Sequence, residues 1–196
     1  MKGVRNLLNK DKRADKLGEL WDIYDEKNEL TGRTHHRGEK LNVGDYHLVV
    51  NALIFNIQGN VLLQQRSFQK ITDPGMWTIA TGGSALTGET SESAVIRELH
   101  EELNLIVTKN QLQFLKKCRY VVCIDESLDN MTRQISEVEA IKWATLSEVF
   151  QISRSNDFND DHILIQAKTK LLDTDNGQFY TCLLYTSPSP RDRSLS

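Results

Sequence analysis

Three carboxylates close together on one predicted helix are the residues best placed to do chemistry. Glu98, Glu101 and Glu102 stand within five positions of the chain, and at 100° per residue their side chains fall within about 100° of one another. Like charges at these spacings repel by about 0.2–0.5 kcal/mol per pair, and the negative end of the helix dipole adds to the cost. Arg97 can neutralise one carboxylate, so a hard divalent cation is the natural partner for the others.

An acidic run is, taken alone, more typical of a solvated helix face. The surrounding residues favour the metal site, because they extend the run into a longer pattern with fixed spacing. Its members are Gly83, Glu89, Arg97, Glu98, Leu99, Glu101, Glu102 and Leu105. This pattern resembles the Nudix box, the signature of the Nudix hydrolases. Asn104 stands where the box has a helix-ending glycine, and asparagine is the best substitute for glycine in a left-handed conformation.

The resemblance implies a fold and an activity. The fold is an α/β (α+β) Nudix fold, in which a mixed β-sheet is sandwiched between helices and the box forms a loop–helix–loop. The activity is hydrolysis of a diphosphate bond in a nucleoside-diphosphate-linked or related small molecule, by water attacking phosphorus. The implied cofactor is Mg²⁺ or Mn²⁺, which neutralises the diphosphate and lowers the pKa of bound water. The likeness extends over about residues 20 to 149.

The metal ligands that the resemblance implies are carried over residue by residue. Glu98 and Glu102 would bind the metal directly, and Glu101 would be a further ligand or would orient the attacking water. The backbone carbonyl group of Gly82 would supply another oxygen, or that of Gly83 in its place. The protein would contribute chiefly positioning and charge stabilisation.

Other residues of the box are expected to support these ligands. Glu89 and Arg97 would hold the loop and the carboxylates in place, with Gly83 beside them. The catalytic set that the resemblance implies is thus Arg97 together with Glu101 and Glu102.

The flanking sequence resembles one branch of the family, that of type 1 isopentenyl-diphosphate isomerase. The shared stretches are residues 21–25, 31–35, 46–50, 65–67, 74–77 and 80–83. In that branch, protonation of an unactivated alkene needs a cysteine and a metal-binding histidine just after a Trp-Thr pair. The corresponding residues here, 77–84, contain neither, which makes isomerase activity the least favoured function. His47 matches an isomerase metal ligand, but without its partners we expect a hydrogen-bonded strand histidine.

Residues outside the box give weaker candidates. Arg66, at the end of a predicted strand, could bind a substrate phosphate with two hydrogen bonds or could be a surface arginine. Glu137 and Glu139 precede another strand, and either could be an additional base or ligand, since spacing does not choose between them. The pair His35 and His36 is expected to be a loop pair, because no further ligand completes a metal motif nearby.

The elements that must position these residues follow from hydrophobic periodicity and turn residues. We expect two hairpins, a loop over 68–77, a glycine-rich turn over 81–84 and then the helix that carries the acidic run. Residues 115–124 should form two paired strands, although no obvious turn separates them. The expected hairpins are 21–34 and 46–65; the helices are 90–103, 146–150 and 162–172; further strand-like segments are 114–124 and 138–143.

Composition excludes several classes of protein. The 196 residues carry 24 basic and 27 acidic groups, a net charge of −3, whereas nucleic-acid binding needs a basic surface. The apolar run 48–55 is far shorter than the ~20 residues of a membrane span. Three cysteines, Cys118, Cys123 and Cys182, have neither metal-finger spacing nor an even count, which favours a reducing cytoplasm. A homodimer is compatible with the sequence, which does not define the oligomeric state.

The chain divides into three expected segments. Residues 1–19 form an N-terminal arm and 20–181 the Nudix domain. Residues 182–196 place two prolines and two arginines among serines and resemble the translated read-through of a transposon-end adapter used in sequencing libraries, so we expect them to be non-native. A disordered native tail is the other interpretation.

Three functions fit these residues to different degrees. The first is a Mg²⁺-dependent diphosphate hydrolase. The second is a non-catalytic Nudix module that binds a nucleotide metabolite, although a binding module has little reason to keep three mutually repelling carboxylates. The third is the isomerase, which the missing cysteine and histidine disfavour.

Overall fold

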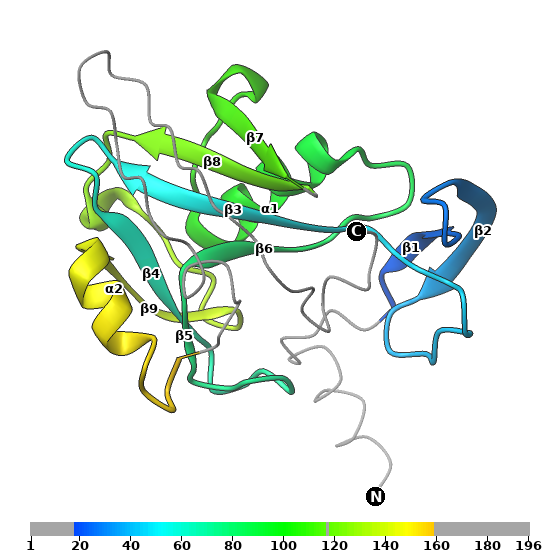
Figure 1. The fold of residues 1–196 in the computed structure, drawn as a ribbon, viewed down its shortest axis with the longest axis horizontal. Helices are drawn as coiled ribbons and strands as arrows, with labels where there is room; N and C mark the ends of the chain where they lie inside the picture. The colour runs from blue at the N-terminus through cyan, green and yellow to red at the C-terminus, as the bar shows by residue number, and fades with distance from the viewer. Residues whose placement is uncertain (1–17, 117, 159–196) are drawn as a thin grey trace, which may run out of the picture.

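The computed structural model describes residues 18–116 and 118–158, and shows a small hairpin beside a larger mixed sheet with two helices (Figure 1). The expected helix 162–172, residues 1–17 of the expected arm 1–19, Cys182 and the tail all lie outside the described residues. The strands are β1 Leu20–Tyr24, β2 Leu30–His36, β3 Val49–Asn56, β4 Val61–Arg66, β5 Trp77–Thr78, β6 Ala80–Ser84, β7 Leu112–Lys116, β8 Arg119–Ile124 and β9 Val138–Ala144. The α-helices are α1 Ser91–Leu103 and α2 Leu146–Ile152, and the 3₁₀ turns are η1 Lys109–Gln111 and η2 Leu128–Asn130.

Strand β3 is the centre of the larger sheet. It runs parallel to β8 and antiparallel to β6, and its end pairs with the start of β4 at Phe55 and Val61. Strand β4 then pairs antiparallel with β5 and β9, while β7 pairs with β8 at the far edge. The sheet therefore contains both parallel and antiparallel pairs, as predicted.

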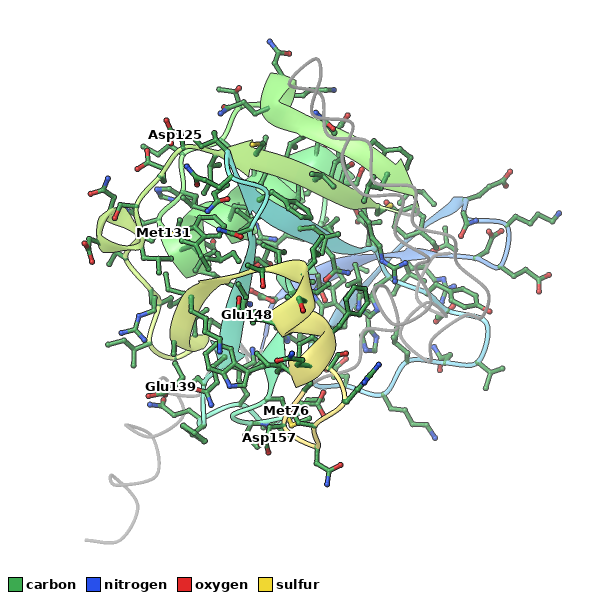
Figure 2. All side chains as sticks on the ribbon, turned by 60° about the vertical axis from the view of Figure 1, so that its left-hand side comes forward. Met76, Asp125, Met131, Glu139, Glu148 and Asp157 are labelled. Carbon is green, nitrogen blue, oxygen red and sulfur yellow. The ribbon has the colours of Figure 1, made fainter. Side chains whose placement is uncertain are left out.

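The apolar side chains of β3 alternate between two cores, because successive residues of a strand point to opposite faces. Val50 and Ile54 belong to a core that includes the apolar side of α1. Leu53 and Phe55 belong to the other core, to which α2 contributes Val149. In Figure 2, α2, with the labelled Glu148, lies in front of the strands. The prediction of a sheet between helices is confirmed, and no helix in the described part of the chain is long and apolar enough to span a membrane.

One predicted element is wrong and another is explained. Residues 81–84 belong to strand β6 rather than to a turn, with Gly82 opposite Asn51 on β3. Glycines mark a close backbone approach here, since a Cβ on Gly82 would lie 2.1 Å from the Val50 carbonyl oxygen. The paired strands expected over 115–124 are β7 and β8, and Cys118, at φ +58°, occupies the turn between them.

Helix α1 begins and ends at side chains suited to its caps. Thr90 accepts a hydrogen bond from the Ser93 amide at 3.2 Å, and Ser93 Oγ accepts one from the Thr90 amide at 2.9 Å. At the other end Asn104 adopts φ 56° and ψ 31°, the left-handed conformation expected for the position where the box has glycine. Its amide donates to the His100 carbonyl at 2.8 Å. Both ends of the carboxylate-bearing helix are thus closed by local hydrogen bonds.

The cap at Asn104 gives a first prediction. Asn104→Ala should lower the free energy of unfolding by about 1 kcal/mol, because a Cβ without a polar group is unfavourable in this conformation. Asn104→Gly should leave it equal or higher. Urea unfolding measures both, and His100→Ala, at an exposed position in the same turn, is the control. An Asn104→Ala protein as stable as wild type would show that the helix end tolerates any residue.

Candidate active site

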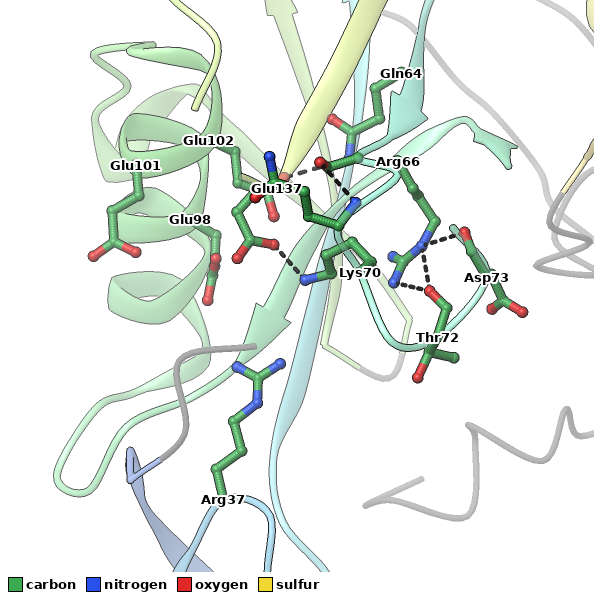
Figure 3. A network of polar contacts seen from close by, with 12 residues as sticks. Arg37, Gln64, Arg66, Lys70, Thr72, Asp73, Glu98, Glu101, Glu102 and Glu137 are labelled. Atoms are coloured by element: carbon green, nitrogen blue, oxygen red, sulfur yellow. Dashed lines mark hydrogen bonds and ion pairs between the residues drawn. The ribbon is translucent and has the colours of Figure 1, made fainter. Parts of the chain in front are cut away.

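Helix α1 presents three glutamates to one side and its apolar residues to the sheet. Val95, Leu99 and Leu103 are fully buried in the core. Glu98 and Glu102, one turn apart, are each only 6% exposed, whereas Glu101 is partly exposed. Figure 3 shows Glu98 and Glu102 on the side of the helix that faces Glu137 and Lys70, with Glu101 farther from them. Two of them are therefore not surface charges, which decides against a solvated acidic face.

Arg97 is the cation that holds one side of this cluster. Its Nε and Nη2 donate to the two oxygens of Glu89 at 2.8 and 2.9 Å. Its Nη1 donates to Glu98 Oε1 at 2.8 Å and to Glu101 Oε2 at 3.3 Å. Burial opposes the charge of Arg97, but the bonds to Glu89 and Glu98 outweigh it and raise the pKa of Arg97. The guanidinium therefore stays charged and ties the carboxylates to the loop before α1.

Glu89 fixes that loop in turn. Its Oε2 accepts a hydrogen bond from the Leu86 amide at 2.8 Å, and Arg97 Nη2 donates to the Ser84 carbonyl at 3.0 Å. Arg97 and Glu89 thus bind the end of β6 to the first turns of α1. Both residues therefore contact the loop and the carboxylates, and their supporting role in a metal site stays a prediction.

The two glycines of β6 lie close to different neighbours. An added Cβ on Gly83 would lie 2.5 Å from Glu98 Oε1, so the absence of a side chain makes room for that carboxylate. Gly82 lies against β3. The strand and the helix therefore approach closely because these positions carry no side chain.

Glu102 lies in the most confined part of the cluster. Its Oε2 accepts a hydrogen bond from Gln64 Nε2 at 3.3 Å. Burial, followed by the charges of Glu98 and Glu137, raises the pKa of Glu102 to about 8. Because its neighbours are other carboxylates, an ionised Glu102 would be stabilised by a cation beside it.

Glu137 joins this cluster from the other side of the site, and Glu139 does not. Glu137 is 8% exposed, forms an ion pair with Lys70, and its charge acts on Glu102 (Figure 3). Glu139 is only partly buried on β9 and is labelled in Figure 2. Residues two apart share a face in a regular strand, but here the register with β4 shifts, because Gln65 pairs with Ala140 and Arg66 with Val138, and Glu139 is the extra residue. Only the sheet pairing therefore distinguishes the two glutamates.

Arg66 holds a loop rather than standing free at the strand end. Its Nη2 donates to the Thr72 carbonyl at 2.8 Å, and its Nε donates to the carbonyls of Thr72 and Asp73 at 3.1 and 3.2 Å (Figure 3). Gln65 Nε2 donates to the Gly75 carbonyl at 2.9 Å in the same loop. These contacts position the loop that carries Lys70.

The histidines contact other parts of the chain. His47 precedes β3 rather than lying in a strand, and its ring stacks on Trp21 with centroids 4.1 Å apart. Its Nδ1 is buried and has no hydrogen-bond partner among the described residues, so the expected hydrogen-bonded strand histidine is wrong. Burial, with smaller contributions from Arg37 and His35, lowers the pKa of His47 to about 4. His35 and His36 end strand β2, opposite Trp21 and Leu20 of β1, so the expected loop pair is wrong. His35 Nε2 lies 3.1 Å from the Glu39 carbonyl oxygen.

Three contributors to the cluster were not identified from the sequence: Gln64, Lys70 and Thr81. A signal existed for Gln64, a polar residue directly after the apolar residues 61–63. Lys70 and Thr81 lie in a loop and a glycine-rich stretch, where a lysine or threonine is unremarkable. Only the tertiary arrangement brings them beside the carboxylates.

The side chains of this cluster are of the type that binds a hard divalent cation, because they are buried carboxylates that repel one another. In the described residues no three His, Cys, Asp or Glu side chains are already arranged around a common point where a metal ion could be held. The ion pairs explain this arrangement, since Arg97 draws Glu98 to one side and Lys70 draws Glu137 to the other. Binding of a cation would require these side chains to rotate toward Glu102.

Comparisons with known proteins agree with this fold. Residues 45–166 match the family model of the NUDIX domain. The chain is 36% identical over 148 residues to an uncharacterised Nudix hydrolase of Listeria monocytogenes, covering 71% of this chain and 88% of the relative. The crystal structure of DR0079 from Deinococcus radiodurans is similar with a TM-score of 0.61 and 23% identity, covering 74% of this chain and 94% of that one.

The chain therefore belongs to the Nudix family and is a Nudix-type diphosphate hydrolase. The predicted family, fold and class of enzyme are confirmed. An isopentenyl-diphosphate Delta-isomerase of Cutibacterium acnes is 25% identical over 129 residues, covering 56% of this chain and 65% of the relative.

The two glycines of β6 give a second prediction. Gly82→Ala should lower the free energy of unfolding by about 3 kcal/mol, because its Cβ would meet the backbone of β3, which cannot move aside. Gly83→Ala should cost about 1 kcal/mol or less, because the flexible Glu98 side chain can move away. It should instead weaken Mn²⁺ binding by roughly tenfold. Urea unfolding and a Mn²⁺ titration separate the two effects, and equal losses of stability would contradict the assignment.

The raised pKa of Glu102 gives a third prediction, for the metal-free protein. The folded state binds a proton at Glu102 more tightly than the unfolded chain, so stability should fall as the pH rises from about 4.5 to about 8. Glu102→Gln should remove that part of the loss and, above pH 8, raise the free energy of unfolding by on the order of a few kcal/mol. Melting temperatures across this pH range in EDTA measure it. Identical pH profiles for the two proteins would contradict it.

Proposed function

We propose that this protein hydrolyses the diphosphate bond of a nucleoside-diphosphate-linked or related small molecule with Mg²⁺ bound at Glu98 and Glu102. The observation that carries the proposal is the burial of these two carboxylates, one turn apart on α1 and facing Glu137. Buried charges are retained in proteins when they are paired or bind a metal. Glu102 has no cationic side chain bonded to it among the contacts found in the described residues, only the neutral amide of Gln64.

Each residue near the cluster has a role in this proposal. Glu98 and Glu102 supply metal ligands, and the Gly82 carbonyl supplies a further oxygen. The partly exposed Glu101 is a further ligand or accepts a hydrogen bond from the attacking water. When bound, the metal neutralises the diphosphate and lowers the pKa of bound water. Arg97, held by Glu89, keeps Glu98 and Glu101 oriented toward the same side of α1.

The opposite side of the site is closed by the loop after β4. Glu137 is the glutamate outside the box that this geometry favours as base or additional ligand, because it is buried and acts on Glu102. Lys70 is paired with it and balances its charge while no metal is bound. Arg66 contributes by holding the loop, and the hydrogen bonds of its guanidinium to Thr72 and Asp73 leave little support for a direct phosphate contact.

The remote likeness to isomerases does not extend the proposal to isomerisation. The residues after Trp77 and Thr78 form β6, whose small and apolar side chains include neither a cysteine nor a histidine. Proton transfer to and from a carbon atom needs an acid and a base on the substrate. The sequence offers neither at that strand, whereas diphosphate hydrolysis needs only the carboxylates and a bound cation.

The fourth prediction tests the proposal by turnover. Wild type and Glu102→Gln are incubated with Mg²⁺ and a panel of dinucleotides, sugar nucleotides, coenzyme A derivatives and isoprenoid diphosphates, and the products are separated by chromatography. Wild type should cleave the diphosphate bond of at least one of these classes of substrate. Glu102→Gln should lose roughly 100-fold or more in kcat, because it loses a metal ligand.

The control is Glu139→Gln, a charge-neutralising change on β9 outside the cluster, which should keep wild-type turnover. Cleavage that persists in Glu102→Gln would contradict the assignment of the site. A folded wild-type protein that binds metal and substrate without turnover would instead establish a binding module.

A further inference from the structure

We propose that Gln64, oriented by Thr81, is a positioning residue that holds the carboxylate of Glu102 in the orientation needed to bind the metal. The inference rests on the proposed function, since it concerns the same metal site. It goes beyond the box, because Gln64 lies on β4 and Thr81 on β6, while Glu102 lies on α1.

Every polar atom of the Gln64 side chain has a partner. Its Nε2 donates to Glu102 Oε2 and to the Ala80 carbonyl, both at 3.3 Å. Its Oε1 accepts a hydrogen bond from Thr81 Oγ1 at 2.9 Å. Gln64 is 6% exposed and Thr81 2% exposed. A buried primary amide costs free energy unless all its groups are paired, so these three bonds determine where the side chain lies.

The orientation of the amide follows from the chemistry of its neighbours. The Ala80 carbonyl offers only an acceptor, and so does Glu102 in the ionised state that binds a metal, so the NH₂ group must face them. The amide oxygen then faces Thr81, whose hydroxyl donates. A flipped amide would place its oxygen against the carboxylate and the carbonyl, and two buried acceptors would repel. Thr81 therefore supports the orientation in which Gln64 donates to Glu102.

This contact opposes the forces that would turn Glu102 away. Glu98 and Glu137 both carry charges that act on Glu102 unfavourably, and a flexible carboxylate would rotate away from them. The bond from Gln64 holds Oε2, so that Oε1 would be the oxygen available to a cation. Gln64 directly follows the apolar residues 61–63, where an apolar side chain would cost less free energy to bury than an amide does. Packing alone therefore does not explain an amide at this position, whereas its hydrogen bond to Glu102 does.

The experiment measures Mn²⁺ affinity by electron paramagnetic resonance, without substrate, for wild type, Gln64→Met, Thr81→Val and the double variant. Gln64→Met keeps the side-chain length and removes the donor, and should weaken Mn²⁺ binding by roughly 10- to 100-fold. Thr81→Val should weaken it by a smaller factor, and Thr81→Ser should restore wild-type affinity. In the double variant Thr81→Val should add no further loss, because Thr81 acts through Gln64.

The matched control is Gln113→Met, the same substitution at an exposed position of β7, at the far edge of the sheet from β4. It should bind Mn²⁺ as wild type does. If Gln64→Met does not fold, as judged by circular dichroism, Gln64→Asn serves in its place, since the shorter amide cannot reach both partners.

The possible results distinguish failure of the role of Gln64 from failure of the metal site. Wild-type affinity in folded Gln64→Met would overturn the inference while leaving the metal site intact. Additive losses in the double variant would overturn the role of Thr81. A wild-type protein that does not bind Mn²⁺ would overturn the proposed function itself.

Discussion

The repulsion between buried carboxylates on one face of α1 is the constraint to which the rest of this site responds. Glu98 and Glu102 are one helical turn apart and almost completely buried, and Glu137 adds its charge to theirs. A buried charge without a partner is among the most costly features a protein can contain. Three contacts reduce that cost. Arg97 pairs with Glu98, Lys70 pairs with Glu137, and Gln64 donates a hydrogen bond to Glu102.

The sheet makes this concentration of charge feasible by holding the helix from behind. Strand β3 supplies apolar side chains to both faces, and α1 buries Val95, Leu99 and Leu103 against one of them. The glycines of β6 let that strand lie close to both β3 and the helix. Apolar burial on one side of α1 thus offsets repulsion on the other, and the capped helix ends prevent the acidic turn from unwinding.

The second half of the site comes from parts of the chain distant in sequence. Lys70 is carried by a loop that Arg66 and Gln65 hold through backbone carbonyls. Ser67 joins the same loop to β9, since its amide donates to the Glu137 carbonyl at 2.9 Å. The ammonium group of Lys70, which pairs with Glu137, is therefore positioned by contacts to the backbone of its own loop. A local change in this loop would alter the charge balance at the carboxylates.

The sequence by itself determined the helix, its caps and the members of the acidic run, because helical periodicity and capping depend on residues only a few positions apart. It also carried the family resemblance, whose spacing lies within one continuous segment. It could not distinguish Glu137 from Glu139, and it placed a turn where Gly82 and Gly83 form a strand. Those outcomes depend on which strands pair, a matter of contacts between residues far apart in the chain. The partners of Glu102 were decided in the same way: Gln64 and Thr81 meet it only because β4, β6 and α1 come together in the folded protein.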